Sequence, residues 1–170
     1  MSIDGQRLLI TDSNEGSDFE EINALSIART PAMPLVNFGF NEYRGSNFTG
    51  DFSGPYPTDA ALTFPVSQYS KGTGPRSGRS ITNGYVYRGT ATSLRGQYVF
   101  ADAATGNIWS VPASSLVEGQ NLSSARYETR NLDFTPDVGQ INQIKSFGED
   151  SAGNLYIVDY DGDIFLIAAG

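Results

Sequence analysis

The chain of 170 residues contains no cysteine and no histidine. The absence of cysteine excludes disulfide bridges, thiolate metal sites and cysteine nucleophiles. The absence of histidine excludes a Ser-His-Asp triad and histidine-liganded zinc, and it removes the commonest general base. Functions that depend on either residue type are therefore excluded within this chain.

Long hydrophobic runs and an excess of basic residues are also missing. No segment approaches the roughly 18 apolar residues of a membrane-spanning helix. Lysine and arginine total 11 against 19 acidic residues, for a net charge of −8. Because a phosphate-binding surface needs an excess of cations, nucleic acid is not an expected partner. The opening MSIDGQRLLITD has no charged-then-apolar secretion signal, which predicts a cytosolic protein or a piece whose signal lay upstream.

No long stretch has the 3.6-residue periodicity of an amphipathic helix. Hydrophobic residues make up 39% of the chain and aromatic residues 12%, enough for the core of a single domain. Short segments rich in Tyr, Val, Ile and Phe alternate with turns drawn from 19 glycines and 8 prolines. This pattern predicts an all-β protein.

The clearest local pattern is YVFADAATGNIWSVP, residues 98–112. Its residues alternate at period two, which predicts two strands joined by a turn from Asp102 to Gly106. The C-terminal run LYIVDYDGDIFLIA repeats it, with Asp159 matching Asp102 and Gly162 matching Gly106 after one residue of slippage in the turn. The sequence therefore predicts a repeat architecture.

A third, looser copy lies in residues 7–25, where RLLITD and FEEINAL flank a polar turn. That turn is a candidate oxygen-ligand site for Ca²⁺, or simply a solvated loop. A four-stranded repeat of about 56 residues is typical of a β-propeller blade.

We therefore expect one partial β-propeller domain over residues 1–170, with about two to three four-stranded blades. Residues 1–79 form an incomplete blade, lacking its first strand, plus a long loop rich in aromatics, proline and glycine. Residues 80–137 form one full blade, in which Asn83-Gly84 is either a tight turn or a bulge, and ARYETRNLDF supplies the fourth strand. Residues 138–170 form a last blade without its fourth strand. Because propellers close with about 4–8 blades, the rest must come from deleted sequence, a partner or copies of this chain.

The loop within residues 26–79 is richer in aromatic residues than a disordered linker would be. It is expected to be ordered and packed by its own rings, and only residues 64–70 have the pattern of a strand.

Several segments, taken in order, resemble the glucose/sorbosone dehydrogenase family. They are RLLITDSNEGSDFEEINAL, NFGFNEYRG, SITNGYVYRG, GQYVFADAATGNIWSVP and INQIKSFGEDSAGNLYIVDYDGDIFLI. That family includes soluble quinoprotein aldose dehydrogenases and hedgehog-interacting-protein-like propellers. The resemblance implies the C-terminal part of a six-bladed propeller that binds pyrroloquinoline quinone (PQQ) and Ca²⁺ and oxidises sugars by hydride transfer. It also implies a periplasmic or extracellular location.

Carried over residue by residue, the resemblance assigns cofactor-binding positions to Asn14, Glu20, Gln143 and Lys145, and metal-binding positions to Glu15 and Gly16. The alternative for these residues is ordinary loop and strand-end polarity. Ala104 stands where quinoprotein members place a cofactor-binding lysine, and the catalytic histidine has no counterpart. Since hydride transfer needs a base for the hydroxyl proton, the chain alone is expected to be inactive.

Two other functions are compatible with the sequence. The first is a non-catalytic propeller-type binding module that recognises carbohydrate or protein through the aromatic loop at residues 38–64. The second is a ring completed by association of two copies of the chain.

Overall fold

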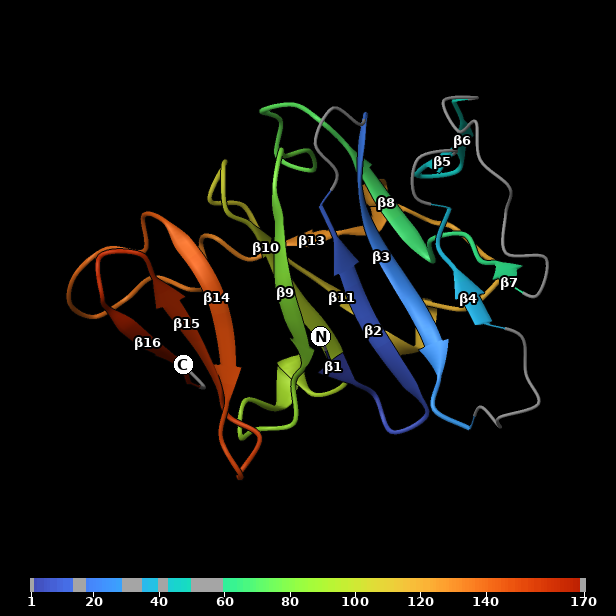
Figure 1. The fold of residues 1–170 in the computed structure, drawn as a ribbon. Coiled ribbons are helices and arrows are strands. Elements are labelled where there is room, and N and C mark those ends of the chain that lie inside the picture. Colours follow the sequence, from blue (N-terminus) through green and yellow to red (C-terminus); the bar gives the residue numbers. More distant parts are fainter. Residues whose placement is uncertain (1, 14–17, 29–34, 40–42, 50–59, 169–170) are drawn as a thin grey trace.

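The computed structural model describes residues 2–13, 18–28, 35–39, 43–49 and 60–168. It confirms the all-β prediction: in this part of the chain the regular structure consists of open sheets, mostly antiparallel, and three short 3₁₀ turns (Figure 1). The turns are η1 (Thr92–Leu94), η2 (Ala113–Ser115) and η3 (Ser124–Arg126).

The first sheet has the strand order β1-β2-β3-β8-β12. Its strands are β1 (Ser2–Ile3), β2 (Arg7–Asp12), β3 (Phe19–Ser26), β8 (Ser67–Ser70) and β12 (Leu122–Ser123). The antiparallel β2–β3 pair confirms the hairpin predicted over residues 7–25. Two features were not predicted: the short first strand β1, and β12, which joins β8 in parallel from a connection expected to be a loop.

The second sheet is antiparallel, with the order β13-β11-β10-β9. Its strands are β9 (Ile81–Val86), β10 (Gln97–Asp102), β11 (Ile108–Pro112) and β13 (Glu128–Thr129). Three of them match the predicted blade, but the fourth strand is only two residues long. Asn131 explains this, because its side chain accepts the Ile108 N–H (3.0 Å) and donates to the Gly106 carbonyl (2.7 Å), where strand backbone would otherwise pair.

The third sheet has three strands, as predicted: β14 (Ile144–Glu149), β15 (Leu155–Asp159) and β16 (Ile164–Ile167). It repeats the second sheet in detail. Gly106 and Gly162 both have positive φ, 72° and 104°, in the turns that follow the matching aspartates. The inner strands β9 and β14 each carry one extra residue at the same place, opposite β10 and β15. Asn83-Gly84 therefore lies at a β-bulge within a continuous strand and not at a tight turn.

The second sheet lies between the other two and is buried on both faces. The predicted alternation is confirmed: Tyr98 and Phe100 pack toward the first sheet, and Val99 and Ala101 pack toward the third. β9 contacts β14 on one side and both β1 and β2 on the other (Figure 1). The side chain of Asn83 joins the inner strands directly, because it accepts the N–H of Phe147 (3.0 Å).

The outer faces of the first and third sheets differ. On the third sheet, Ile164 and Leu166 are 64% and 52% exposed and point away from the core. On the first sheet, Glu21 and Asn23 are buried, and the Gly45 N–H binds the Glu21 carboxylate (2.6 Å). The connection after β3 therefore covers the polar face, whereas the apolar face stays open.

The connection between β3 and β8 contains more regular structure than the expected strand at residues 64–70. β4 (Leu35–Asn37) pairs in parallel with β7 (Ala60–Leu62), and β5 (Tyr43–Arg44) forms a hairpin with β6 (Asn47–Phe48). The prediction that the rest of this loop is irregular was therefore wrong. The two ladders pair backbone N–H and C=O groups, which a packed segment cannot leave without hydrogen bonds. No helix among the described residues is long and apolar enough to cross a membrane.

Candidate functional site

The residues proposed for a cofactor site lie on different sheets. Glu20 is on β3 of the first sheet, whereas Gln143 and Lys145 lie at the start of β14 in the third sheet. The second sheet separates them (Figure 1). Asn14, Glu15 and Gly16 lie outside the described residues.

Glu20 is fully buried, and both of its oxygens face other parts of the chain. Oε2 accepts the N–H of Ile81, the first residue of β9, at 2.9 Å. Oε1 lies 3.3 Å from the Nζ of Lys71. Burial of a carboxylate is costly unless such partners compensate for the lost water. Glu20 thus fastens the second sheet to the first, an interaction that joins residues far apart in sequence.

Gln143 and Lys145 have exposed side chains. The Gln143 backbone N–H binds the Asp159 carboxylate (3.1 Å), and the Lys145 ammonium lies 5.5 Å from the centre of the Tyr160 ring. Ala104, at the position where the resemblance implies a cofactor-binding lysine in quinoprotein members, belongs to the turn after β10 and donates its N–H to Asp102.

The described cofactor positions, Glu20, Gln143 and Lys145, do not come together in one place, and the metal-binding positions Glu15 and Gly16 lie outside the described residues. The Glu20 carboxylate is already bound within the fold, and Lys145 lies over Tyr160. Among the described residues, no three Asp or Glu side chains come close enough to share a metal ion.

A different site forms around the aromatic residues of the connection. The Tyr43 ring meets Phe48 and Phe64 edge to face, with centroid distances of 5.4 and 5.1 Å. Phe48 is 63% exposed and Phe64 is 41% exposed, so each ring keeps one side open to water. This arrangement agrees with the expectation that the loop is packed by its own rings. The three-ring group is called the aromatic surface below.

Polar side chains hold this surface on the first sheet. The Ser46 N–H donates to Gln68 Oε1 (3.0 Å), and Asn121 Nδ2 donates to Ser46 Oγ (3.0 Å). Glu118, from the same connection as Asn121, accepts the Ser26 N–H (2.9 Å). The β11–β13 connection is thereby tied to the edge of the aromatic surface.

An open hollow of about 530 Å³ lies between these two connections. Apolar and aromatic side chains line it together with amide, hydroxyl and carboxylate groups. The lining consists of Ser46, Leu62, Thr63, Phe64, Pro65, Glu118, Gly119, Gln120 and Asn121. Its size falls within the range of small-molecule sites.

Electrostatics beneath the aromatic surface are set by burial. Burial raises the pKa of the Glu21 carboxyl, while the Gly45 N–H and the Asn23 amide lower it in part. Burial likewise raises the pKa of Asp12, which pairs with Glu21 across the β2–β3 ladder. The two carboxyls lie below the surface and are not part of the hollow.

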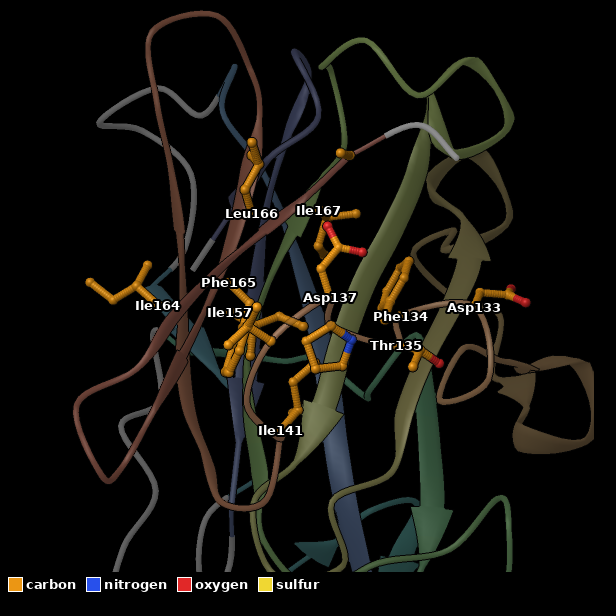
Figure 2. Close-up of a pocket in the computed structure, with 13 residues that line it drawn as sticks. Asp133, Phe134, Thr135, Asp137, Ile141, Ile157, Ile164, Phe165, Leu166 and Ile167 are labelled. Atoms are coloured by element: carbon orange, nitrogen blue, oxygen red, sulfur yellow. The ribbon is translucent and has the colours of Figure 1, made fainter.

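A second hollow, of about 480 Å³, lies at β16 (Figure 2). Figure 2 shows Phe134, Ile141, Ile157 and Phe165 around it, whereas Ile164 points away. These four side chains pack on the core between the second and third sheets. β16 corresponds to β11, whose outer edge pairs with β13, and no described strand pairs with the outer edge of β16. This hollow is therefore the exposed edge of the core rather than a site with converging polar groups.

No protein-family model matches the chain, and no solved structure matches it.

The sequence singled out the aromatic loop but missed Glu118, Gln120 and Asn121. They occur in a polar connection, and nothing in that segment indicates that it folds back onto the first sheet through β12. The aromatic richness of residues 38–64 was the only available signal for this site.

Proposed function

We propose that this chain is a non-catalytic binding module that holds a carbohydrate at the aromatic surface and its hollow. The observation that carries the proposal is a single hollow lined by both the partly exposed Phe64 ring and the amide of Asn121. The alternative ligand is a protein segment, which would use the same aromatic rings but would not require the polar groups of the hollow.

The chemistry of a sugar matches this mixed lining of aromatic and polar groups. A pyranose has C–H groups on its faces and hydroxyls around its rim, so the faces pack on the electron-rich face of an aromatic ring. The rim needs hydrogen-bond donors and acceptors, and amide side chains provide both. Gln120 and Asn121 supply these groups within the hollow that Phe64 lines. A few polar groups in an otherwise apolar site are what fixes orientation in ligand sites.

Binding to a panel of immobilised glycans tests the proposal, followed by titration of the best glycan. Phe64→Ala and Asn121→Ala are each expected to weaken binding about tenfold, as for interface residues in a packed site. Tyr160→Ala is the matched control, because it removes a ring that is 70% exposed on the third sheet. All three variants should melt within a few degrees of the wild type. Equal loss with the control, or no glycan bound, contradicts the proposal; binding of a peptide instead favours the protein ligand.

The second candidate is the C-terminal part of a glucose/sorbosone dehydrogenase-like propeller, secreted or periplasmic, whose missing blades come from elsewhere. Its support is the repeated design of the sheets around β9, β14 and the β1–β2 pair. A thermal melt with and without PQQ plus Ca²⁺ tests it. A ligand that binds only the folded state at about 100 times its dissociation constant stabilises by about 2.7 kcal/mol. An unchanged midpoint contradicts a retained quinone site.

A further inference from the structure

Two sheets use the same device to fix their inner strand. At the end of β10, Asp102 Oδ2 accepts the consecutive N–H groups of Arg79 and Ser80, both at 2.7 Å. At the end of β15, Asp159 accepts those of Asn142 and Gln143, at 2.8 and 3.1 Å.

The residue after each pair is also the same. Ile81 lies opposite Asp102 in the β9–β10 ladder, and Ile144 lies opposite Asp159 in the β14–β15 ladder. In each case two polar residues, whose N–H groups reach the aspartate, directly precede the inner strand. The strand itself begins with isoleucine. Carboxylate bonds to backbone N–H groups are charge-assisted, and they are about twice as strong as neutral ones.

Asp12 is the third copy of this aspartate, at the end of β2 in RLLITD. No hydrogen-bond donor among the described residues reaches its carboxylate, although the side chain is half-buried. Burial accordingly raises its pKa. β1 pairs with β2 only at Leu8 and Leu9, and no described strand pairs with Thr11 or Asp12 on that side.

We propose that this free edge of β2 binds an extended peptide segment of another polypeptide, antiparallel to β2, with two consecutive N–H groups on Asp12 and an isoleucine next in the chain. The main-chain pairing is β-augmentation, in which an added strand extends an exposed sheet edge. The preferred sequence is basic or polar, then polar, then isoleucine, as in Arg79-Ser80-Ile81. A basic residue in the segment complements the net charge of −8.

The chain supplies its own probe, the capped and fluorescein-labelled peptide SGRSITNG with the sequence of residues 77–84. Fluorescence anisotropy against the intact protein measures its dissociation constant. Asp12→Ala is expected to raise that constant about tenfold or more, because two charge-assisted hydrogen bonds are lost. Methylation of the two peptide nitrogens that match Arg79 and Ser80 should have a similar effect. Asp137→Ala, which removes an exposed carboxylate and changes the net charge equally, should leave the constant unchanged.

Hydrogen exchange locates the bound peptide. Protection is expected to rise in residues 7–12 and to stay constant in residues 97–102, which shows that the peptide has not displaced the native β9. Asp12→Asn keeps the shape of the side chain and one acceptor oxygen, and it should bind the peptide with intermediate strength. This variant provides the test if Asp12→Ala fails to fold. No binding up to millimolar peptide, equal affinity of the wild type and both Asp12 variants, or protection only in residues 97–102 overturns the proposal. Self-association that depends on Asp12 overturns it in favour of a second copy of this chain.

Discussion

Replacement of Asp102 by alanine should be among the most destabilising single changes in this chain. The carboxylate is fully buried and accepts six hydrogen bonds. Its donors are the N–H groups of Arg79, Ser80, Ala104 and Thr105 and the hydroxyls of Tyr69 and Thr105. They come from the first sheet, the start of β9 and the turn before β11, so one side chain holds three segments together.

The size of the destabilisation by Asp102→Ala depends on which hydrogen-bond donors lose their only partner. The Tyr69 side chain is 1% exposed, so its hydroxyl would be left without a partner at a cost of about 1–3 kcal/mol. The backbone donors near the surface regain water, at about 0.5–1.5 kcal/mol each, and removal of a buried charge offsets part of the sum. A net loss of about 3–5 kcal/mol remains, which lowers the melting midpoint by about 6–20 °C for a chain of this length.

The matched comparison is Asp12→Ala, which removes the same residue type from the equivalent position of the first sheet. Because no described donor binds Asp12, we expect less than about 1 kcal/mol of destabilisation. Urea unfolding of both variants measures the difference. A double-mutant cycle of Asp102→Asn with Tyr69→Phe then isolates the Tyr69–Asp102 bond, at 2.8 Å, as a coupling energy. The reasoning is refuted if Asp102→Ala costs no more than Asp12→Ala.

Two further predictions concern pH and close packing. Burial raises the pKa of Glu21 and Asp12 above 4.5 and 3.8, so their contribution to stability is present below those values and is lost as pH rises through the raised pKa. Glu21→Gln should therefore flatten the fall in the melting midpoint as pH rises above about 4.5, and an unchanged pH profile would contradict this. Gly84→Ala should destabilise by about 3 kcal/mol or more, because the new Cβ would lie 2.5 Å from the Val99 carbonyl oxygen. Gly148→Ala, at a strand position where a Cβ meets nothing within 4 Å, should be neutral or stabilising, and equal losses in the two variants by urea unfolding would refute the packing argument.

The parts of the fold that the sequence predicted are those whose signals are local. The β10–β11 hairpin follows from period-two alternation on both sides of an aspartate-to-glycine turn, and its repeat in β15–β16 needed only a second copy of the pattern. The bulge at Asn83-Gly84 was one of two interpretations, because glycine within a strand pattern marks either a bulge or a turn. Only the position of Gly84 opposite Phe100 decides between them.

The parts that escaped prediction depend on contacts between distant segments. β12 pairs with Ser67 and Gln68 and is only two residues long. A strand this short has no alternation of apolar and polar residues from which to predict it. Asn131 ends the fourth strand through hydrogen bonds to β11 and its preceding turn, and an asparagine in a polar segment gives no sign of this. Glu20 was singled out for its position, but its role depends on the N–H of Ile81, which only the packing of two sheets brings to it.

The outer faces of the first and third sheets differ, so the two ends of the stack of sheets are not equivalent. On the first sheet the outer polar side chains Glu21 and Asn23 are buried, and the β5–β6 hairpin already covers this face. The face that carries Ile164 and Leu166 is the one on which another molecule would bury apolar surface. Open-ended assembly into fibres requires two complementary faces on each molecule, and of these two outer faces only that of the third sheet presents exposed aliphatic side chains among the described residues. Copies that meet through their third sheets bury each other's apolar face, so association through this face alone ends at a pair.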